Sequence, residues 1–239
     1  MAFVTRRGPW FVVGVLSLAI VFVALSVAVV IANSRTQSPT TGSYPRVAEI
    51  PRTDDVWPAV AFIGDAYTAG AAAGGAGNRY TTILCAQKRW RCSVNGQAGT
   101  GFTTRGPGTR GESEFVQRLS AVSKDGKPEI IVAQGGADTQ SDPAQLAAAV
   151  TDFIQTSKRM YPDAQLYIIG TLVGPRSDRV AIRRTTETVE RAASLLGVAF
   201  VDPNEDNWMK DPALFSEDGI TLNQRGYRAY AERLGAYIP

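Results

Sequence analysis

Five short apolar runs, separated by longer segments with helical periodicity, constrain the fold of this chain more than any other feature. They are VAFI, CSVN, IIVA, QLYII and VAFV, at residues 60–63, 92–95, 130–133, 165–169 and 198–201. CSVN is the weakest of the five. The others are mainly apolar without alternating polar positions, which is typical of strands in a parallel sheet covered on both faces. We expect each run to form one strand.

The segments between the runs favour helices. In residues 143–161 the apolar side chains recur at helical spacing and share one face: Leu146, Val150, Phe153, Ile154 and Met160. Pro143 directly after Asp142 is a good helix start. Residues 178–196 and 224–237 are two further helix candidates. Strands that alternate with helices predict a three-layer α/β/α sandwich around a five-stranded parallel sheet.

A second feature sets the N-terminal part of the chain apart. Residues 10–32 form an uncharged run of 23 residues, roughly 34 Å long as a helix, which is enough to cross a bilayer. A buried core helix seldom stays apolar on all sides for this length, and the apolar region of a cleavable signal peptide is shorter. Arg6 and Arg7 precede the run, so we expect its N-terminus to lie in the cytoplasm. The predicted organisation is a cytoplasmic N-terminus (1–9), a transmembrane helix (10–32), an extracytoplasmic Ser/Thr/Pro-rich linker (33–56) and a globular domain (57–239).

Charge and cysteine content exclude several functions. Without the two arginines before the apolar run, 23 basic residues face 22 acidic ones, and no basic stripe supports nucleic-acid binding. Cys85 and Cys92 are the only cysteines, and outside the membrane such a pair more often forms a disulfide than a metal site. The chain has no histidine, the commonest nitrogen ligand of zinc. We therefore expect a disulfide, no metal and no cofactor.

The loops that follow the first, second, third and fifth strands should meet beyond the carboxyl ends of the strands. The first of these loops reads GDAYTAG (64–70), the second contains Gly99 and Gly101, the third reads GGAD (135–138) and the last contains DGITLN (218–223). In this order the loops resemble the four blocks of the SGNH (GDSL-type) hydrolases, a family of esterases and lipases. GDAYTAG resembles the Gly-Asp-Ser block, and Gly99, or less well Gly101, resembles the glycine of the second block. GGAD resembles Gly-Gly-Asn-Asp, and DGITLN resembles Asp-Gly-Ile-His-Pro-Asn. The resemblance implies an SGNH/flavodoxin-like fold for the globular domain.

Three substitutions separate this chain from the family pattern. The resemblance implies a nucleophilic serine, an oxyanion-hole asparagine and a histidine base, whose positions here hold Ala66, Ala137 and Thr221. The retained elements are the backbone N–H groups of Ala66 and Gly99 and the carboxylate of Asp218. Acyl transfer needs a nucleophile, a base and oxyanion donors, and losing one triad member already costs several orders of magnitude in kcat. The pattern therefore predicts a pseudoenzyme, with no active catalytic residue.

Three hypotheses about function remain open. The first is a module on the bacterial plasma membrane that binds an envelope glycan or lipid through four loop residues: Asp65, Gly99, Asp138 and Thr221. For Asp65 and Asp138 we favour a different interpretation, in which their carboxylates accept hydrogen bonds that hold the loops and do not contact a ligand. The second hypothesis is a scaffold that docks a membrane-protein partner, and the third is an esterase that uses groups foreign to the family. Trp208 and Phe215 could line the binding site, although a position in the core is slightly favoured.

Overall fold

A parallel five-stranded sheet forms the centre of the computed structural model, which describes residues 57–109, 111–123, 126–205 and 208–239. The strands are β1 (Ala59–Gly64), β2 (Arg91–Gly96), β3 (Ile130–Gln134), β4 (Gln165–Ile169) and β5 (Ala199–Val201). Their order is β2-β1-β3-β4-β5, and every neighbouring pair is parallel. All five predicted strands are confirmed, each to within two residues at either end.

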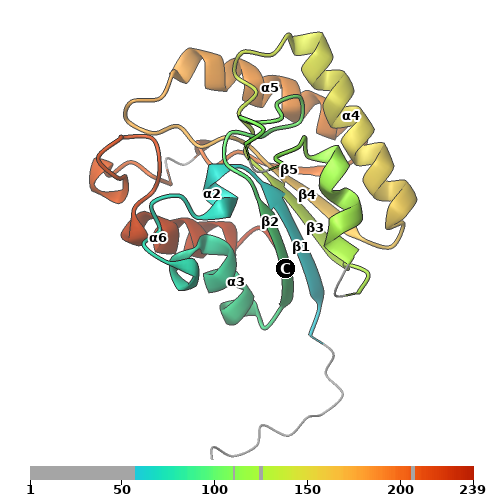
Figure 1. Cartoon of the computed structure of the whole chain (residues 1–239), viewed down its shortest axis with the longest axis horizontal. Coiled ribbons are helices and arrows are strands. Elements are labelled where there is room, and N and C mark those ends of the chain that lie inside the picture. The colour runs from blue at the N-terminus through green and yellow to red at the C-terminus, as the bar shows by residue number, and fades with distance from the viewer. Residues whose placement is uncertain (1–56, 110, 124–125, 206–207) are drawn as a thin grey trace, which may run out of the picture. The chain divides into compact units, whose positions relative to one another are not determined.

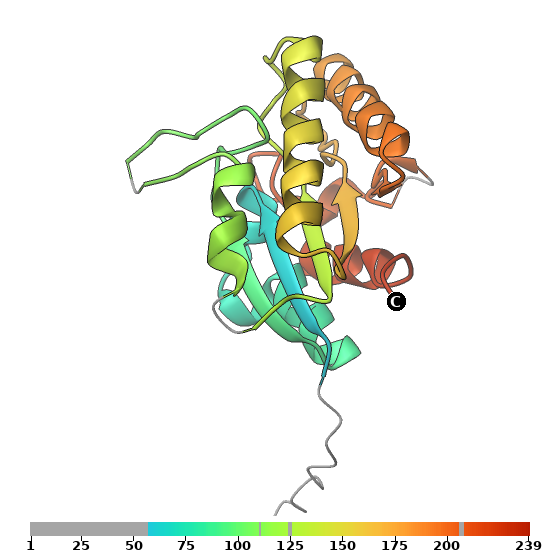
Figure 2. The same ribbon diagram turned by 90° about the vertical axis from the view of Figure 1, so that its right-hand side faces the viewer.

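Helices cover both faces of the sheet, which confirms the predicted sandwich. The α-helices are α2 (Ala66–Ala69), α3 (Tyr80–Lys88), α4 (Pro143–Met160), α5 (Arg179–Leu195) and α6 (Gln224–Leu234). Short 3-10 helices lie at η1 (Ala76–Asn78), η2 (Val116–Ser123) and η4 (Pro212–Leu214). Figure 1 shows α3 and α6 together on one face of the sheet and α4 and α5 on the other, and Figure 2 shows the same layers from the side.

Each face of the sheet packs its own apolar cluster. Phe62 and Val132 point toward α3 and α6, whereas Ile63 and Ile131 point toward α4, α5 and η2. Because successive strand residues point to opposite faces, a strand covered on both sides must be apolar throughout. This is why the run in β1 is continuously buried.

The α4 face follows the predicted periodicity with one correction. Leu146, Val150, Phe153 and Ile154 are buried, but Met160 at the end of the helix is 39% exposed. The helix ends at this residue, and its buried face continues through Ser157 and Tyr161 instead. Asp142 caps the other end, where its carboxylate accepts hydrogen bonds from the N–H groups of Ala144 and Gln145.

A disulfide links Cys85 of α3 to Cys92 of β2, with an S–S distance of 1.98 Å, as the cysteine pattern predicts. It fastens α3 to the edge strand of the sheet.

The predicted transmembrane run at 10–32 and the linker at 33–56 lie outside the described residues. Within the described residues, no helix is both long and apolar enough to cross a bilayer.

Candidate functional site

The first loop starts where β1 ends and turns directly into the short helix α2. Asp65 caps this helix, because its Oδ1 accepts a hydrogen bond from the backbone N–H of Tyr67 (2.9 Å). Gly64 has no room for a side chain, since a Cβ there would lie 2.1 Å from Thr68 Oγ1. Ala66 is the first residue of the helix and is partly exposed at the carboxyl edge of the sheet.

The second carboxylate oxygen of Asp65 joins this loop to the loop after β3. Oδ2 accepts a hydrogen bond from the backbone N–H of Gly136 (2.9 Å). β1 lies between β2 and β3, so this contact spans the point at which the strand order reverses, where open parallel sheets bind their ligands.

Asp138 connects the loops after β2 and β3. Its carboxylate accepts hydrogen bonds from the backbone N–H of Phe102 (2.8 Å) and of Thr103 (3.0 Å), and from the hydroxyls of Thr103 (2.8 Å) and Thr104 (2.9 Å). Gly101 packs against it so closely that a Cβ would lie 2.2 Å from Asp138 Oδ2. The side chain is buried and its acceptors are occupied, which matches the role of a residue that holds the loops.

The fourth loop places Thr221 beside Asp218. Thr221 Oγ1 donates to Asp218 Oδ2 (2.6 Å), and Ser216 Oγ donates to Asp218 Oδ1 (2.8 Å). The backbone N–H groups of Ile220 and Thr221 also donate to Asp218 Oδ1. Tyr67 donates its hydroxyl to the backbone oxygen of Ile220, which brings this loop against α2 and hence next to position 66. The four loops that resemble the family blocks therefore meet, as the sequence predicts.

The two carboxylates at Asp65 and Asp218 have opposite electrostatics. Burial, as the largest effect, raises the pKa of Asp65 to about 6. The two backbone hydrogen bonds that it accepts favour the charged form and oppose this rise. Slight desolvation at Asp218 is outweighed by the hydrogen bonds from Thr221, Ile220 and Ser216, which hold its pKa well below the usual range. Asp218 is therefore a fixed anion and a weak base.

Two backbone donors remain available at the meeting point of the loops. In the described part of the chain, neither Ala66 N–H nor Gly99 N–H has a hydrogen-bond acceptor. Gly101 N–H, the alternative for the second block, donates to Thr104 O (2.8 Å), and Ala137 N–H donates to Thr100 O (3.0 Å). The geometry thus leaves Ala66 and Gly99 as donors for an incoming carbonyl or carboxylate oxygen.

A buried arginine, which sequence reasoning missed, supports the base of the site. Arg118 of η2 donates to the backbone oxygens of Gly64 (3.2 Å) and Asn95 (2.9 Å) and to Thr100 Oγ1 (3.0 Å). It thereby ties the ends of β1 and β2 to the loop that carries Gly99. Burial lowers its pKa to about 10, and the nearby charge of Asp65 opposes this shift. No local sequence pattern distinguishes it from a solvated helix charge.

Gln134, the last residue of β3, was also missed. In its buried side-chain amide, Nε2 donates to Asp65 Oδ1 (3.3 Å) and Thr68 Oγ1 (2.8 Å), and Oε1 accepts from Gly135 N–H (3.1 Å).

Trp208 and Phe215 are both buried in the core, which confirms the favoured interpretation that they do not line the SGNH site. No group of three or more metal-ligating side chains occurs within the residues that the structure describes.

Comparisons with known proteins agree with this geometry. The model of the GDSL-like lipase/acylhydrolase family matches residues 62–229. The chain is 28% identical over 192 residues to GDSL lipase Rv0518 of Mycobacterium tuberculosis, covering 75% of this chain and 80% of that protein.

Two solved structures share the fold. One is an active-site mutant of a family two carbohydrate esterase from Clostridium thermocellum, with a TM-score of 0.60 and 20% identity, covering 76% of this chain and 63% of that chain. The other is a carbohydrate acetylesterase family member from Sinorhizobium meliloti, with a TM-score of 0.60 and 15% identity, covering 75% of this chain and 96% of that chain. The family match spans the loops that carry the four blocks, and the chain therefore belongs to the GDSL-like lipase/acylhydrolase family, that is, to the SGNH hydrolases.

Proposed function

We propose that this domain keeps the SGNH fold without its acyl-hydrolase reaction, and that it binds a ligand of the bacterial cell envelope. One observation carries the proposal: at the position of the family's histidine, the Thr221 hydroxyl donates to Asp218. The contact that would orient a catalytic base is thus occupied by a side chain that cannot act as one at neutral pH.

The remaining groups do not replace the missing chemistry. Ala66 presents a methyl group where a nucleophile would stand. Asp218 has a lowered pKa, so it takes a proton poorly, and Asp65 is buried with both oxygens accepting hydrogen bonds. A nucleophile needs an adjacent base to be activated, and the family's positions for these groups supply neither a nucleophile at Ala66 nor a base at Thr221.

The retained donors suit binding. The free N–H groups of Ala66 and Gly99 would hold an ester, amide or carboxylate oxygen, with the Thr221 loop beside them. Acylated or acetylated glycans and lipids are the ligands that we favour, because the relatives are named a lipase and carbohydrate esterases. In this proposal Asp65 and Asp138 contribute by holding the loops.

The proposed location is the outer face of the bacterial plasma membrane. Residues 10–32 would anchor the protein as a single-pass helix with a cytoplasmic N-terminus, and residues 33–56 would tether domain 57–239. A scaffold that docks a membrane-protein partner is the competing function for the same arrangement, and it predicts no small-molecule ligand.

One observation favours a second candidate, residual ester hydrolysis. Ser216 Oγ and Thr221 Oγ1 lie 2.7 Å apart, and both contact the carboxylate of Asp218. Here a hydroxyl nucleophile is paired with a carboxylate base. The low pKa of Asp218 weighs against it.

Ester hydrolysis by the purified full-length protein tests both candidates. Short and medium acyl chromogenic esters would be offered to the native protein and to the triple variant Ala66→Ser, Ala137→Asn, Thr221→His. An Asp218→Asn change in each background is the matched control. We expect no turnover by the native protein and measurable turnover by the triple variant, lost again with Asp218→Asn.

Native turnover that Asp218→Asn abolishes would overturn the proposal and support the second candidate. If neither protein turns over, the loops do not present the family's site geometry, and the scaffold function becomes the better explanation.

A further inference from the structure

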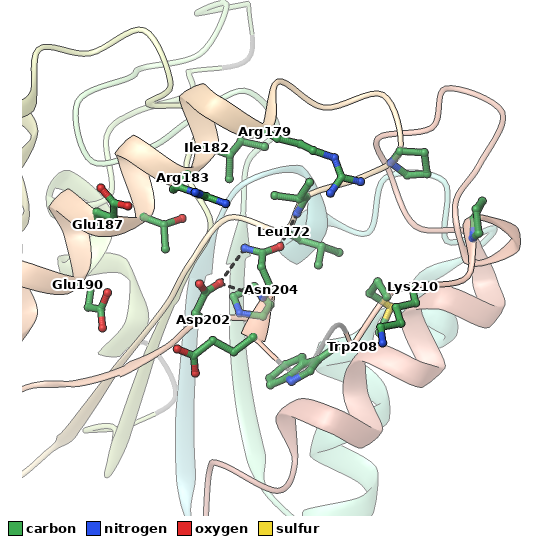
Figure 3. Close-up of a pocket in the computed structure, with 17 residues that line it drawn as sticks. Leu172, Arg179, Ile182, Arg183, Glu187, Glu190, Asp202, Asn204, Trp208 and Lys210 are labelled. Atoms are coloured by element: carbon green, nitrogen blue, oxygen red, sulfur yellow. Dashed lines mark hydrogen bonds between the residues drawn. The ribbon is translucent and has the colours of Figure 1, made fainter.

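A large hollow lies on the other side of the loop after β4, away from the SGNH site. It has a volume of about 720 Å³ and is lined by that loop, by α5 and by the segment after β5 (Figure 3). Ligand pockets typically measure ~300–1,000 Å³. Leu172, Ile182 and Trp208 close its floor and are all buried. None of the residues at the four SGNH block positions lines it.

The loop after β4 separates the hollow from the SGNH site. The backbone N–H of Arg176 donates to Gly219 O (3.0 Å), and a Cβ on Gly174 would lie 2.5 Å from the same oxygen. The hollow is therefore one loop away from Asp218, and changes on its α5 side leave the SGNH positions untouched.

Charged side chains of both signs surround this hollow. The basic ones are Arg179, Arg183 and Lys210, and the acidic ones are Glu187, Glu190, Asp202 and Glu205. Figure 3 shows Arg179 and Arg183 extending from α5 at one end and Glu187 and Glu190 at the other. Within the described residues, none of these seven forms an ion pair, and the ion pair that the structure shows is elsewhere, between Arg105 and Glu114.

The charges on α5 are of opposite sign at the two ends of the hollow. Arg179 is the first residue of the helix, where the helix dipole disfavours a cation, and Arg183 follows one turn later. Arg183 and Glu187 carry opposite charges four residues apart, a spacing that favours the helix, but the described residues show no ion pair between them. Both side chains therefore remain available to a molecule in the hollow.

A buried hydroxyl lacks a partner on the same helix face. Thr186 lines the hollow and is only 6% exposed, and its Oγ1 has no hydrogen-bond partner. Its neighbours Thr185 and Thr188 bond back to the helix carbonyls of Ala181 and Arg184, as helical threonines commonly do. An unpaired buried hydroxyl is unfavourable. This oxygen is covered in the present conformation, so a ligand hydroxyl would reach it after a rotation of the threonine side chain about χ1.

We propose that this hollow binds a short saccharide that carries one anionic group. Sugar hydroxyls both donate and accept, so they can bond carboxylates at one end of the hollow and guanidinium groups at the other. The anionic group would lie at the Arg179 and Arg183 end, where charge-assisted hydrogen bonds are strongest. Glu187 and Glu190 would accept from hydroxyls further along the chain. A simple polyanion is disfavoured because the acidic end would repel it.

Calorimetric titration of the full-length protein with matched sugars tests this. The probes are cellobiose, the same disaccharide oxidised to its uronic acid, and sodium acetate as the free anion. We expect the uronic acid to bind at least about tenfold more tightly than cellobiose, the worth of one charge-assisted hydrogen bond. Three results would overturn the proposal: both sugars bind equally tightly, acetate binds as tightly as the uronic acid, or neither sugar binds.

Variants of α5 locate the ligand. Arg183→Gln should abolish the preference for the acidic sugar, and Glu187→Gln should weaken both sugars equally. Thr186→Val keeps the side-chain shape, so it should weaken binding without lowering the unfolding midpoint. Arg191→Gln is the matched control, because Arg191 is exposed on the same helix but does not line the hollow. Unchanged binding in all three test variants, or an equal loss in the control, would contradict the proposal. Hydrolysis is not measured, so this outcome is separate from that of the proposed function.

Discussion

The buried carboxylate of Asp65 offers the sharpest test of how the loops are held together. We predict that replacing it with asparagine removes a pH dependence of stability that the native protein shows. Asparagine keeps nearly the same shape but only one acceptor oxygen, so it loses one of the two backbone hydrogen bonds that Asp65 accepts. This loss lowers the free energy of unfolding by an amount that does not depend on pH. What changes with pH is the ionisable group, whose pKa rises from 3.8 to about 6 on folding, mainly because of burial.

The sign follows from which state binds the proton more tightly. Folding raises the pKa of this acid, so the folded protein holds the proton better than the unfolded chain does, and lowering the pH stabilises the fold through this group. The gain is absent well above pH 6 and complete below the unfolded value of 3.8. A shift of this size corresponds to about 3 kcal/mol. The donor from Gln134 to Asp65 favours the ionised form, so about 3 kcal/mol is an upper bound.

Denaturant unfolding of both proteins, from neutral pH down to pH 4, measures this difference. We expect the free energy of unfolding of the native protein to rise relative to Asp65→Asn as the pH falls through 6. Asp218 does not interfere, because its lowered pKa affects stability only below the unfolded value of 3.8. A difference between the two proteins that stays constant with pH, or that changes in the opposite direction, would refute the reasoning.

Two further predictions concern the framework of the site. Replacing Cys85 and Cys92 with serine should lower the free energy of unfolding by about 2 kcal/mol, since the disulfide closes a short loop and constrains the unfolded chain; an unchanged denaturant midpoint would speak against this. Gly101→Ala should destabilise the fold by about 2 kcal/mol, because the new Cβ would meet the fixed carboxylate of Asp138. Gly77→Ala is its control and should be nearly neutral, since a Cβ there meets nothing within 4 Å; equal losses in thermal unfolding would contradict the steric argument.

The sequence predicts those parts of the fold that depend on local patterns. The strand in residues 60–63 is apolar at every position, and Asp142-Pro143 is a local start signal, so β1 and α4 were found with little error. Helix α3 was missed. Its threonines are poor helix formers, and its stability comes from burying Tyr80 and Leu84 against α6.

The parts of the site that were missed depend on contacts distant in sequence. Arg118 contacts Gly64, 54 residues away, and only the packing of η2 on the sheet shows that its charge is buried. The hollow beside α5 is lined by segments around Leu172, Arg183 and Trp208, none of which carries a recognisable motif. The four family blocks were visible in the sequence because their residues lie within single loops.

The arrangement of hydrogen bonds explains how three catalytic positions can change while the loops keep their places. The loops are held by Asp65, Asp138 and Asp218, whose carboxylates accept hydrogen bonds from backbone N–H groups in the same or a neighbouring loop. The substituted positions contribute little to this framework. Ala66 and Ala137 have only methyl groups, and Thr221 satisfies Asp218 with its own hydroxyl. Because the framework does not depend on the side chains at the three substituted positions, restoring serine, asparagine and histidine should require no rearrangement of the backbone. Turnover by the triple variant is therefore a test of the loop geometry itself.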